Sequence, residues 1–366
     1  MKYALIIQNL SGGGAQKAMI RLAIALQGRG HEVHFIVISS GGSYEVESDI
    51  QVHRLFRPDG REFGGSLGKF LAVRRLRKLH GRLTETTPFD AIISTLPYTD
   101  HVVYLARLPH VWYRIANTLS QEVAELSRVS RMKGKKRLAR IRKIYSGKNL
   151  IVNSEGSGKD LVENIGVRNA HIEVVFNYID VENIRELSQQ QNSHVPTEPF
   201  AIYVGRRSPA KRLDVLLRAW KIAGLPYRLV LLTRPSPALE KLIDKEGVAD
   251  SVTVVGFQKN PYTWIRAAEM LVLSSDREGL PNVLLEALWL NTKVVSTDCP
   301  SGPREILEFD PEKYLVPVND AEALGDKIRN LWGQAFETPE EFHNKFSPDV
   351  SIKKYEALAA LKSSSM

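Results

Sequence analysis

The chain has 366 residues, of which 43% are hydrophobic and 25% are charged, a composition typical of a globular protein with more than one domain. No apolar run reaches the roughly 18 residues that a membrane-spanning helix needs, and the first residues lack the pattern of a signal peptide. Cys299 is the single cysteine, which excludes an internal disulfide. We therefore expect a cytoplasmic protein.

The formal charge of +9 is unevenly distributed along the chain, with +11 in residues 1–180 and −2 in residues 181–366. Two runs without any acid carry much of the excess. Residues 69–82 hold six basic side chains, and residues 131–148 hold nine. This asymmetry makes the first half a candidate for contact with phosphates, either of nucleic acid or of a membrane surface.

Strand and helix signals alternate from the amino terminus. Residues 3–10 form a short apolar run, followed by the glycine-rich turn 11–14 and then by apolar residues at helical spacing. Further strands are predicted at residues 32–39, 89–95 and 148–154. This alternation predicts a parallel sheet with helices on both faces.

Residues 189–199, QQQNSHVPTEP, are polar and contain two prolines, which indicates a linker. The strand–helix alternation then begins again at residue 200. We predict an α/β protein with two doubly wound, Rossmann-like domains. The predicted division is an amino-terminal domain at residues 1–186, a linker at 187–199, a carboxy-terminal domain at 200–340 and a final helix of undetermined docking within 341–366.

Gly12–Gly14 follows a strand and opens a helix, but it does not fit the dinucleotide fingerprint. The third glycine of that motif would stand at position 17, where the chain has Lys17. The backbone N–H groups of the turn could still meet an anion, and an ordinary tight turn is the alternative. No Asp-x-Asp pair is present, so we expect no metal, and side chains must then meet any phosphate charge.

Candidate phosphate ligands follow the strand predicted at residues 200–205. Arg206 comes directly after it, and Lys211 stands at the entrance of the next helix. Two cations near a helix N-terminus oppose the favoured placement of charge unless an anion lies between them. A guanidinium and an ammonium together suit a diphosphate, whereas a solvated basic turn is the alternative.

Two acids eight residues apart mark the stretch 275–289, SDREGLPNVLLEALW. Pro281 suits the first helical position, which places Glu278 in a loop and Glu286 in the second turn of a helix. A loop carboxylate can accept hydrogen bonds from sugar hydroxyls, and a helix carboxylate can bind a vicinal diol. The alternative is an acid that favours the helix dipole and a satisfied core glutamate.

The ordered segments GRRSPAKRLDVLL, VTVVGF, SSDREGLPNVLLEAL and VVSTDCPSGPREIL together resemble the nucleotide-sugar-dependent retaining glycosyltransferases of the GT-B fold, in particular glycosyltransferase family 4. The glutamates match the Glu-x7-Glu motif of that family. SGGGAQKAM is similar to its amino-terminal Gly-Gly loop, and VVFNYIDVENI to its Asn-x-x-Asp segment.

The resemblance implies a role for each matching residue. It assigns the donor diphosphate to Arg206 and Lys211, the ribose hydroxyls to Glu286 and the transferred sugar to Glu278. The remaining implied positions are backbone groups at Leu280, Asn282 and Val283, base contacts at Gly256, Phe257 and Gln258, phosphate contacts at Gly13 and Gly14, and an acceptor- or sugar-orienting side chain at Asp100 or Asn117.

The implied reaction moves a hexose or N-acetylhexosamine with retention, without cofactor or metal. The UDP-sugar is favoured as donor over GDP-mannose, and the acceptor is a glycolipid, lipopolysaccharide or lipid-linked oligosaccharide of cell-surface polysaccharide synthesis. Apolar residues interleaved with the basic runs 69–82 and 131–148 predict contact with an anionic membrane, hence a peripheral location on the inner face of the cytoplasmic membrane. A solvated basic face is the alternative.

Two other functions are compatible with parts of the sequence. A different GT-B enzyme, such as a nucleotide-sugar epimerase or a sugar phosphorylase, would share the architecture. A nucleic-acid-binding protein would account for the basic charge, but no helix-turn-helix, zinc-finger or aromatic sheet motif is apparent. That function would also leave Glu278 and Glu286 unexplained, so we expect no specific nucleic acid.

Overall fold

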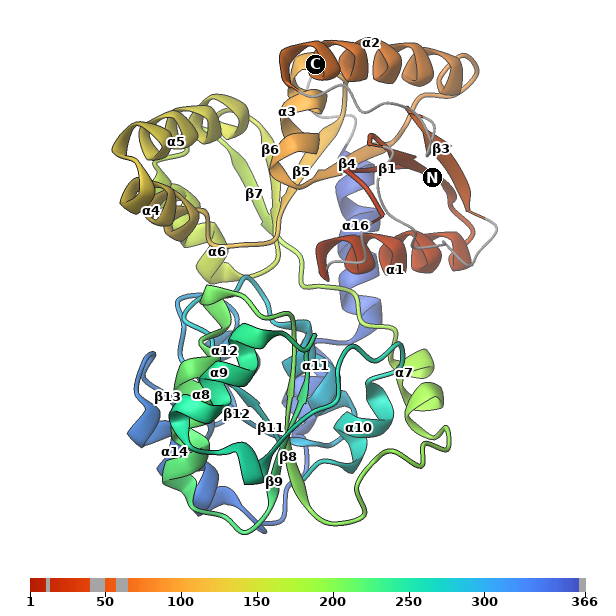
Figure 1. The fold of residues 1–366 in the computed structure, drawn as a ribbon. Helices are drawn as coiled ribbons and strands as arrows, with labels where there is room; N and C mark the ends of the chain where they lie inside the picture. The colour runs from red at the N-terminus through yellow and green to blue at the C-terminus, as the bar shows by residue number, and fades with distance from the viewer. Residues whose placement is uncertain (11–13, 40–49, 57–64, 362–366) are drawn as a thin grey trace. The chain divides into compact units, whose positions relative to one another are not determined.

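The computed structural model describes residues 1–10, 14–39, 50–56 and 65–361, which form two compact α/β units (Figure 1). The first unit comprises Met1–Tyr178 together with Pro348–Met366, and the second comprises Ile179–Ser347. The second unit therefore begins before the segment 187–199 in which the sequence predicts a linker. The chain leaves the first unit at Tyr178 and returns to it at Pro348.

A parallel sheet of seven strands forms the centre of the first unit, in the order β3-β2-β1-β4-β5-β6-β7. Alternate side chains of the interior strand β1 enter two different hydrophobic cores, because Tyr3 and Leu5 face one side of the sheet and Ala4 and Ile6 face the other. This double burial explains the unbroken apolar run near the amino terminus. The strands are β1 (Lys2–Ile7), β2 (Glu32–Val37), β3 (Gln51–Arg54), β4 (Ala91–Thr95), β5 (Val111–Ile115), β6 (Asn149–Val152) and β7 (His171–Val174).

Helices supply both cores of the first unit. One core takes Met19 and Leu22 from α1, and the other takes Leu76 from α2, Val103 from α3 and Ile144 from α5. The helices are α1 (Gly14–Gly28), α2 (Gly65–Leu83), α3 (Pro97–Ala106), α4 (Leu119–Val129), α5 (Arg131–Tyr145), α6 (Glu155–Lys159), a π-helical segment (Asp160–Ile165) and α16 (Pro348–Ala360).

The carboxy-terminal helix α16, whose docking the sequence left open, packs on the first unit beside α1 (Figure 1). Its Ile352, Tyr355 and Leu358 join the same core as α1. The Tyr355 hydroxyl accepts a hydrogen bond from Arg114 Nε at 3.2 Å, and Ser351 Oγ donates to the Phe176 carbonyl oxygen at 3.1 Å. The last helix of the chain is therefore part of the amino-terminal unit.

The second unit has a parallel sheet of six strands in the order β10-β9-β8-β11-β12-β13. Its strands are β8 (Phe200–Val204), β9 (Arg228–Leu232), β10 (Val252–Val254), β11 (Met270–Leu273), β12 (Lys293–Thr297) and β13 (Leu315–Val316). Its helices are α7 (Val181–Ser188), α8 (Leu213–Ala223), α9 (Pro237–Glu246), α10 (Tyr262–Ala267), α11 (Asn282–Trp289), α12 (Pro303–Ile306), α13 (Pro311–Tyr314), α14 (Ala321–Leu331) and α15 (Glu340–Lys345), with 3₁₀ turns at Pro209–Lys211 and Ala249–Ser251.

The strand order of the second unit reverses between β8 and β11, which pair with each other in the middle of the sheet. In open parallel sheets, ligands bind at the carboxyl ends of strands beside such a reversal. The loops that follow β8 and β11 contain Arg206, Lys211 and Glu278. The predicted pair of doubly wound domains is thus confirmed, and the predicted donor residues follow the strands at which the topology expects a ligand.

Among the residues that the structure describes, no helix is both long enough and apolar enough to cross a membrane.

Candidate functional site

Backbone and hydroxyl contacts fasten the loop after β8 to the carboxyl end of β11. The Asp276 amide donates to the Ala210 carbonyl oxygen at 2.9 Å, and Ser274 Oγ donates to the Lys211 carbonyl oxygen at 2.8 Å. Ser274 is fully buried, so its hydroxyl depends on these partners. These contacts hold Lys211 beside the loop that carries Glu278.

Lys211 and Glu278 form an ion pair, with 2.5 Å between Nζ and Oε1. The Ser275 hydroxyl donates to the same carboxylate oxygen at 2.6 Å. The Ser275 carbonyl in turn accepts from Thr297 Oγ1 at 2.5 Å, which links the loop to the end of β12. The side chains are only 22% (Lys211) and 12% (Glu278) exposed, so solvent screens this pair less than a surface ion pair.

The Glu278 charge affects two buried neighbours. Burial, together with this carboxylate, raises the pKa of the Tyr203 hydroxyl and of the Cys299 thiol well above their usual values. Both groups therefore stay protonated near neutral pH, and Cys299 is not a nucleophile. The Tyr203 hydroxyl donates to the Arg206 carbonyl oxygen at 3.4 Å, while the Arg206 side chain is exposed.

Glu286 is buried on α11 between leucines, with 9% of its surface exposed. The Tyr262 hydroxyl, from α10, donates to its Oε1 at 3.3 Å. An acid inside the apolar segment NVLLEALW therefore has a polar partner from a neighbouring helix. This geometry is compatible both with a satisfied core carboxylate and with a ligand-binding one.

The other predicted donor residues lie in the same unit, at the start of α11 or on the loop after β10. Asn282 and Val283 are partly exposed first residues of α11, and Leu280 just before them is buried. Gly256, after β10, has φ +94°, and the neighbouring Phe257 side chain is 70% exposed. Gln258 follows them and is partly exposed.

The candidates of the first unit follow three adjacent parallel strands, β1, β4 and β5. Gly13 lies outside the described residues, and Gly14 is the exposed first residue of α1. Asn117 is exposed and stands two residues after β5.

Asp100, in the first turn of α3, is buried with 1% of its surface exposed. It accepts hydrogen bonds from Ser94 Oγ at 2.5 Å and from the Tyr145 hydroxyl at 2.7 Å. Burial raises the pKa of this carboxyl to about 7, against the opposing effect of both hydrogen bonds and of Arg137. The carboxyl joins α3 to β4 and α5, an arrangement that favours a structural role over contact with an acceptor.

Three basic side chains of the two basic runs, which we call the cationic cluster, act electrostatically on His101 of α3. Burial, together with Lys69 on α2 and with Arg140 and Lys143 on α5, lowers the pKa of His101 to about 4. The hydrogen bond from the Tyr145 hydroxyl to Asp100 ties the end of α5 to the start of α3. The two basic runs, far apart in sequence, therefore contribute charge to one place.

The tip of the α4–α5 hairpin combines exposed apolar and basic side chains. Val129 is 77% exposed and Met132 is 65% exposed. The exposed basic residues of the same tip are Arg128, Arg131, Lys133, Lys135 and Lys136.

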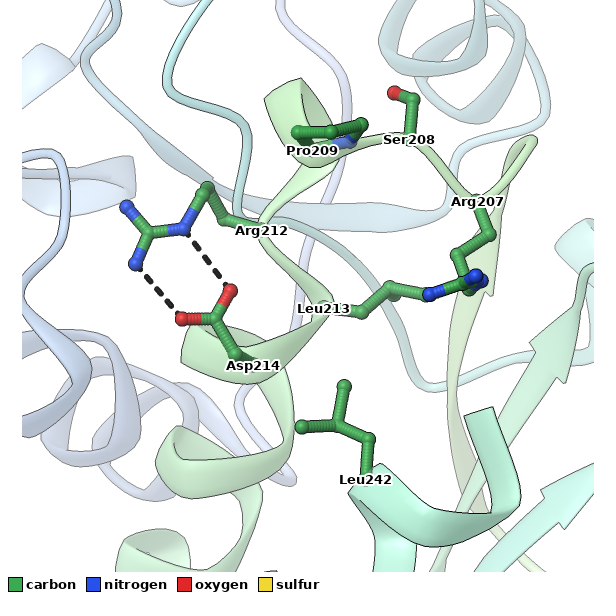
Figure 2. Close-up of a pocket in the computed structure, with 7 residues that line it drawn as sticks. All are labelled: Arg207, Ser208, Pro209, Arg212, Leu213, Asp214 and Leu242. Carbon is green, nitrogen blue, oxygen red and sulfur yellow. Dashed lines mark hydrogen bonds and ion pairs between the residues drawn. The ribbon is translucent and has the colours of Figure 1, made fainter. Parts of the chain in front are cut away.

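A cavity of about 230 Å³ opens beside the loop after β8 (Figure 2). Its wall includes Arg207, Leu242 and the pair Arg212–Asp214, joined by hydrogen bonds of 2.9 and 2.7 Å. Arg212 is therefore already paired with the Asp214 carboxylate. Because neither Lys211 nor Glu278 lines this cavity, we take the ion pair rather than the cavity as the centre of the candidate site.

Ser275 and Tyr262, which contact the two glutamates, were not among the predicted site residues. Neither stands in a position that a local pattern singles out. Their roles depend on contacts between loops and helices that meet only in the folded unit.

Both halves of the chain match known families. Residues 12–183 match the family described as Glycosyltransferase Family 4, and residues 184–346 match the family described as Glycosyl transferases group 1.

Full-length relatives are known from Campylobacter jejuni. N-acetylgalactosamine-N,N'-diacetylbacillosaminyl-diphospho-undecaprenol 4-alpha-N-acetylgalactosaminyltransferase is 27% identical over 339 residues, which cover 90% of each chain. GalNAc-alpha-(1->4)-GalNAc-alpha-(1->3)-diNAcBac-PP-undecaprenol alpha-1,4-N-acetyl-D-galactosaminyltransferase is 25% identical over 337 residues, or 90% of this chain and 88% of the relative. Among solved structures, Anabaena HepE in complex with UDP and glucose superposes with a TM-score of 0.75 at 19% identity, covering 98% of this chain and 100% of that one.

Proposed function

Since the chain belongs to the GT-B glycosyltransferases, with a family 4 half followed by a group 1 half, we propose that it transfers a hexose or N-acetylhexosamine, with retention, from a UDP-sugar to a glycan carried by a lipid diphosphate or lipopolysaccharide. The observation that carries the donor half of this proposal is the Lys211–Glu278 ion pair at the switch point of the second sheet.

The ion pair suggests how donor binding and sugar binding are coupled. A diphosphate brings its own negative charge, so it replaces Glu278 as the partner of Lys211. The Glu278 oxygen released from Lys211 then accepts a hydrogen bond from a hydroxyl of the transferred sugar. Arg206, exposed on the same loop, supplies a second cation for the diphosphate.

Catalysis in this scheme is electrostatic. The bond between the anomeric carbon and the diphosphate oxygen breaks while the acceptor hydroxyl forms its bond to that carbon from the same face and gives its proton to the departing diphosphate oxygen. Arg206 and Lys211 meet the charge that develops on the diphosphate. Because protein cations meet that charge, we expect no metal requirement, and activity should survive excess EDTA. Glu286, steadied by Tyr262, binds the ribose hydroxyls.

Uridine is the favoured base, in keeping with the UDP found in the HepE structure, and GDP-mannose is the alternative donor. The exposed ring of Phe257 and the backbone of Gly256 offer an apolar and hydrogen-bonding edge for the base.

The acceptor class rests on two observations. The names of both Campylobacter relatives specify undecaprenol-linked diphosphate acceptors. In addition, the first unit carries the cationic cluster around His101 and the α4–α5 tip, where apolar side chains stand among basic ones. Such a surface suits an anionic membrane, so we place the enzyme peripherally on the membrane that holds its acceptor.

A donor screen with acceptor dependence tests the reaction. UDP-glucose, UDP-N-acetylglucosamine, UDP-N-acetylgalactosamine and GDP-mannose are incubated with and without undecaprenyl-diphosphate-linked glycans, and released nucleotide and product anomer are measured. We expect UDP release only with acceptor, and an α-linked product. Release that requires orthophosphate would indicate a phosphorylase, and sugar inversion at another carbon without acceptor would indicate an epimerase.

Vesicle flotation tests the membrane part of the proposal separately. We expect binding to vesicles with 30 mol% (about one lipid in three) anionic lipid and little binding to neutral ones, since each basic residue near such a surface contributes about 1 kcal/mol. The variant Val129→Ser/Met132→Ser keeps every basic residue and should lose part of the binding. Equal binding to both kinds of vesicle would contradict the proposal.

A further inference from the structure

Gly302 lies where the loop before α12 packs against the loop before α11. Its φ is +91°, a region that favours glycine. A Cβ atom on this residue would lie 2.6 Å from Pro281 Cδ, 2.7 Å from the Gly279 carbonyl oxygen and 3.0 Å from Leu280 Cα. Three consecutive residues of the neighbouring loop therefore rest directly on Gly302, without room for a methyl group.

The loop that rests on Gly302 joins the two halves of the candidate donor site. Glu278 stands immediately before Gly279, and α11 begins at Asn282, directly after Pro281. Pro281 is the N-cap of α11 and has no side-chain oxygen with which to cap it. The direction of the helix start is therefore set by the packing of the backbone before it.

Gly302 is itself held in place from the other side. Its carbonyl oxygen accepts a hydrogen bond from the Ile306 amide at 3.0 Å within α12. Gly302 is buried, as are Gly279, Leu280 and Pro281. The contact between the two loops is thus an interior one, and a displacement of either loop moves the other.

We propose that Gly302 is a positioning residue for the sugar donor. The absence of a side chain at this position sets the distance from Glu278 to the start of α11, so that the transferred sugar and the diphosphate are held together in one geometry. The proposal rests on the proposed function, since it concerns the same donor site. A misplacement of about 1 Å in such a site costs on the order of 10²-fold in rate.

Three glycine-to-alanine variants separate this role from a general loss of stability. Gly302→Ala places the methyl group against the donor loop. In Gly325→Ala, the Cβ atom lies 2.6 Å from the Ala219 carbonyl oxygen, an equally severe clash between α14 and α8. Gly333 has φ +69° with no atom within 4 Å of a Cβ, so Gly333→Ala tests the backbone conformation alone.

The measurements are the UDP dissociation constant by calorimetry, kcat and KM for the UDP-sugar, and Tm. The binding and kinetic constants are corrected for the folded fraction of each preparation. We expect Gly302→Ala to weaken UDP binding at least about ten-fold and to lower kcat/KM on the order of 10²-fold. Gly325→Ala should lower Tm to a similar extent with unchanged UDP affinity. Gly333→Ala should lower Tm through its strained positive φ alone, also with unchanged UDP affinity. Normal UDP affinity and turnover in Gly302→Ala, or equal loss of affinity in Gly325→Ala, would overturn the proposal.

A double-mutant cycle keeps the test decisive if Gly302→Ala folds poorly. Pro281→Ala removes the Cδ atom that meets the new methyl group, so the double variant Pro281→Ala/Gly302→Ala should bind UDP more tightly than Gly302→Ala or, if that variant does not fold, should recover folding. Additive effects, with no recovery, would refute the positioning role. Lys211→Met separates a failure of the proposed donor site from a failure of the Gly302 role. If Lys211→Met leaves UDP affinity unchanged, the donor site is misplaced. If Lys211→Met loses UDP affinity and Gly302→Ala does not, only the role of Gly302 is refuted.

Discussion

Replacing Lys211 with methionine separates the two roles that we assign to its ion pair, one in the stability of the free enzyme and one in catalysis. Methionine keeps most of the aliphatic length and removes the ammonium that lies 2.5 Å from Glu278. The carboxylate then remains 12% exposed, with Ser275 still donating to it. Removing one partner of a fully buried pair costs about 3–5 kcal/mol, so this partly solvated and still hydrogen-bonded acid should cost about 1–3 kcal/mol in the free energy of unfolding.

The catalytic loss should be larger than the stability loss. If Lys211 meets the charge that develops on the departing diphosphate, its removal resembles the loss of an oxyanion-hole donor. That loss lowers kcat by about 10²–10³-fold, or about 3–4 kcal/mol of transition-state stabilisation. Acceptor-dependent UDP release and urea unfolding, measured on the same preparations, give both quantities.

The double variant Lys211→Met/Glu278→Gln should recover stability while staying inactive. Both charges are then absent, and the new amide oxygen can still accept from Ser275, so no uncompensated charge remains. The matched control is Lys293→Met, because Lys293 pairs with Glu269 at 2.9 Å at the opposite end of β12. That variant should lose stability with unchanged turnover per folded molecule. Turnover of Lys211→Met within a few-fold of the wild type would refute the catalytic role of Lys211. A double variant no more stable to unfolding than the less stable of the two single variants would refute the role of the ion pair in stability.

Three further outcomes follow from the structure. Glu286→Gln should reduce the ratio of the affinities for UDP and 2'-deoxy-UDP, measured by calorimetry. Tyr262→Phe should reduce this ratio by only about five-fold, because one hydrogen bond is worth about 1 kcal/mol. An unchanged ratio in Glu286→Gln would remove Glu286 from the ribose site. Asp100 has a folded-state pKa of about 7 against an ordinary 3.8, so the wild type should lose stability as the pH rises from about 4 to 7, by up to about 1.4 kcal/mol per pH unit, and Asp100→Asn should flatten this slope in urea unfolding. Burial and the nearby basic residues lower the pKa of His101, so its imidazole should titrate near pH 4 in NMR spectra; a midpoint near 6.5 would contradict this combined effect.

The architecture could be read from the sequence because parallel strands buried on both faces are continuous apolar runs. The strand β1 is such a run, and Phe200–Val204 repeats the pattern at the start of the second sheet. The docking of α16 could not be read in this way. An apolar stripe indicates that one face of a helix is buried, but it does not identify what packs on that face. The partners of Tyr355 and Ser351 are residues 114 and 176, which are far from the helix in sequence.

The candidate site also contains residues that the sequence could propose and residues that only the folded structure shows. Arg206, Lys211 and Glu278 could be proposed from the sequence because they follow predicted strands, and Glu286 because it completes a family motif. The hydroxyl partners could not, since Ser275 and Tyr262 matter only through the packing of elements that meet after folding. The cluster around His101 combines α2, α3 and α5, and a charge count along the chain shows the excess without showing where it converges.

In the proposed function, the contrast between Glu278 and Asp100 is one between a binding carboxylate and a structural one. Each stands near the end of a central strand and accepts hydrogen bonds, so position does not distinguish them. The charge of the partners does. Asp100 is held by two neutral hydroxyls in a closed interior, where burial raises its pKa towards neutrality, and no incoming anion could exchange with those donors. Glu278 is held by the Lys211 ammonium as well as by the Ser275 hydroxyl, and in the proposed function a diphosphate competes for that ammonium. A carboxylate whose counter-ion the substrate can take is released when the substrate arrives, which is the property that a sugar-binding residue beside a leaving diphosphate requires.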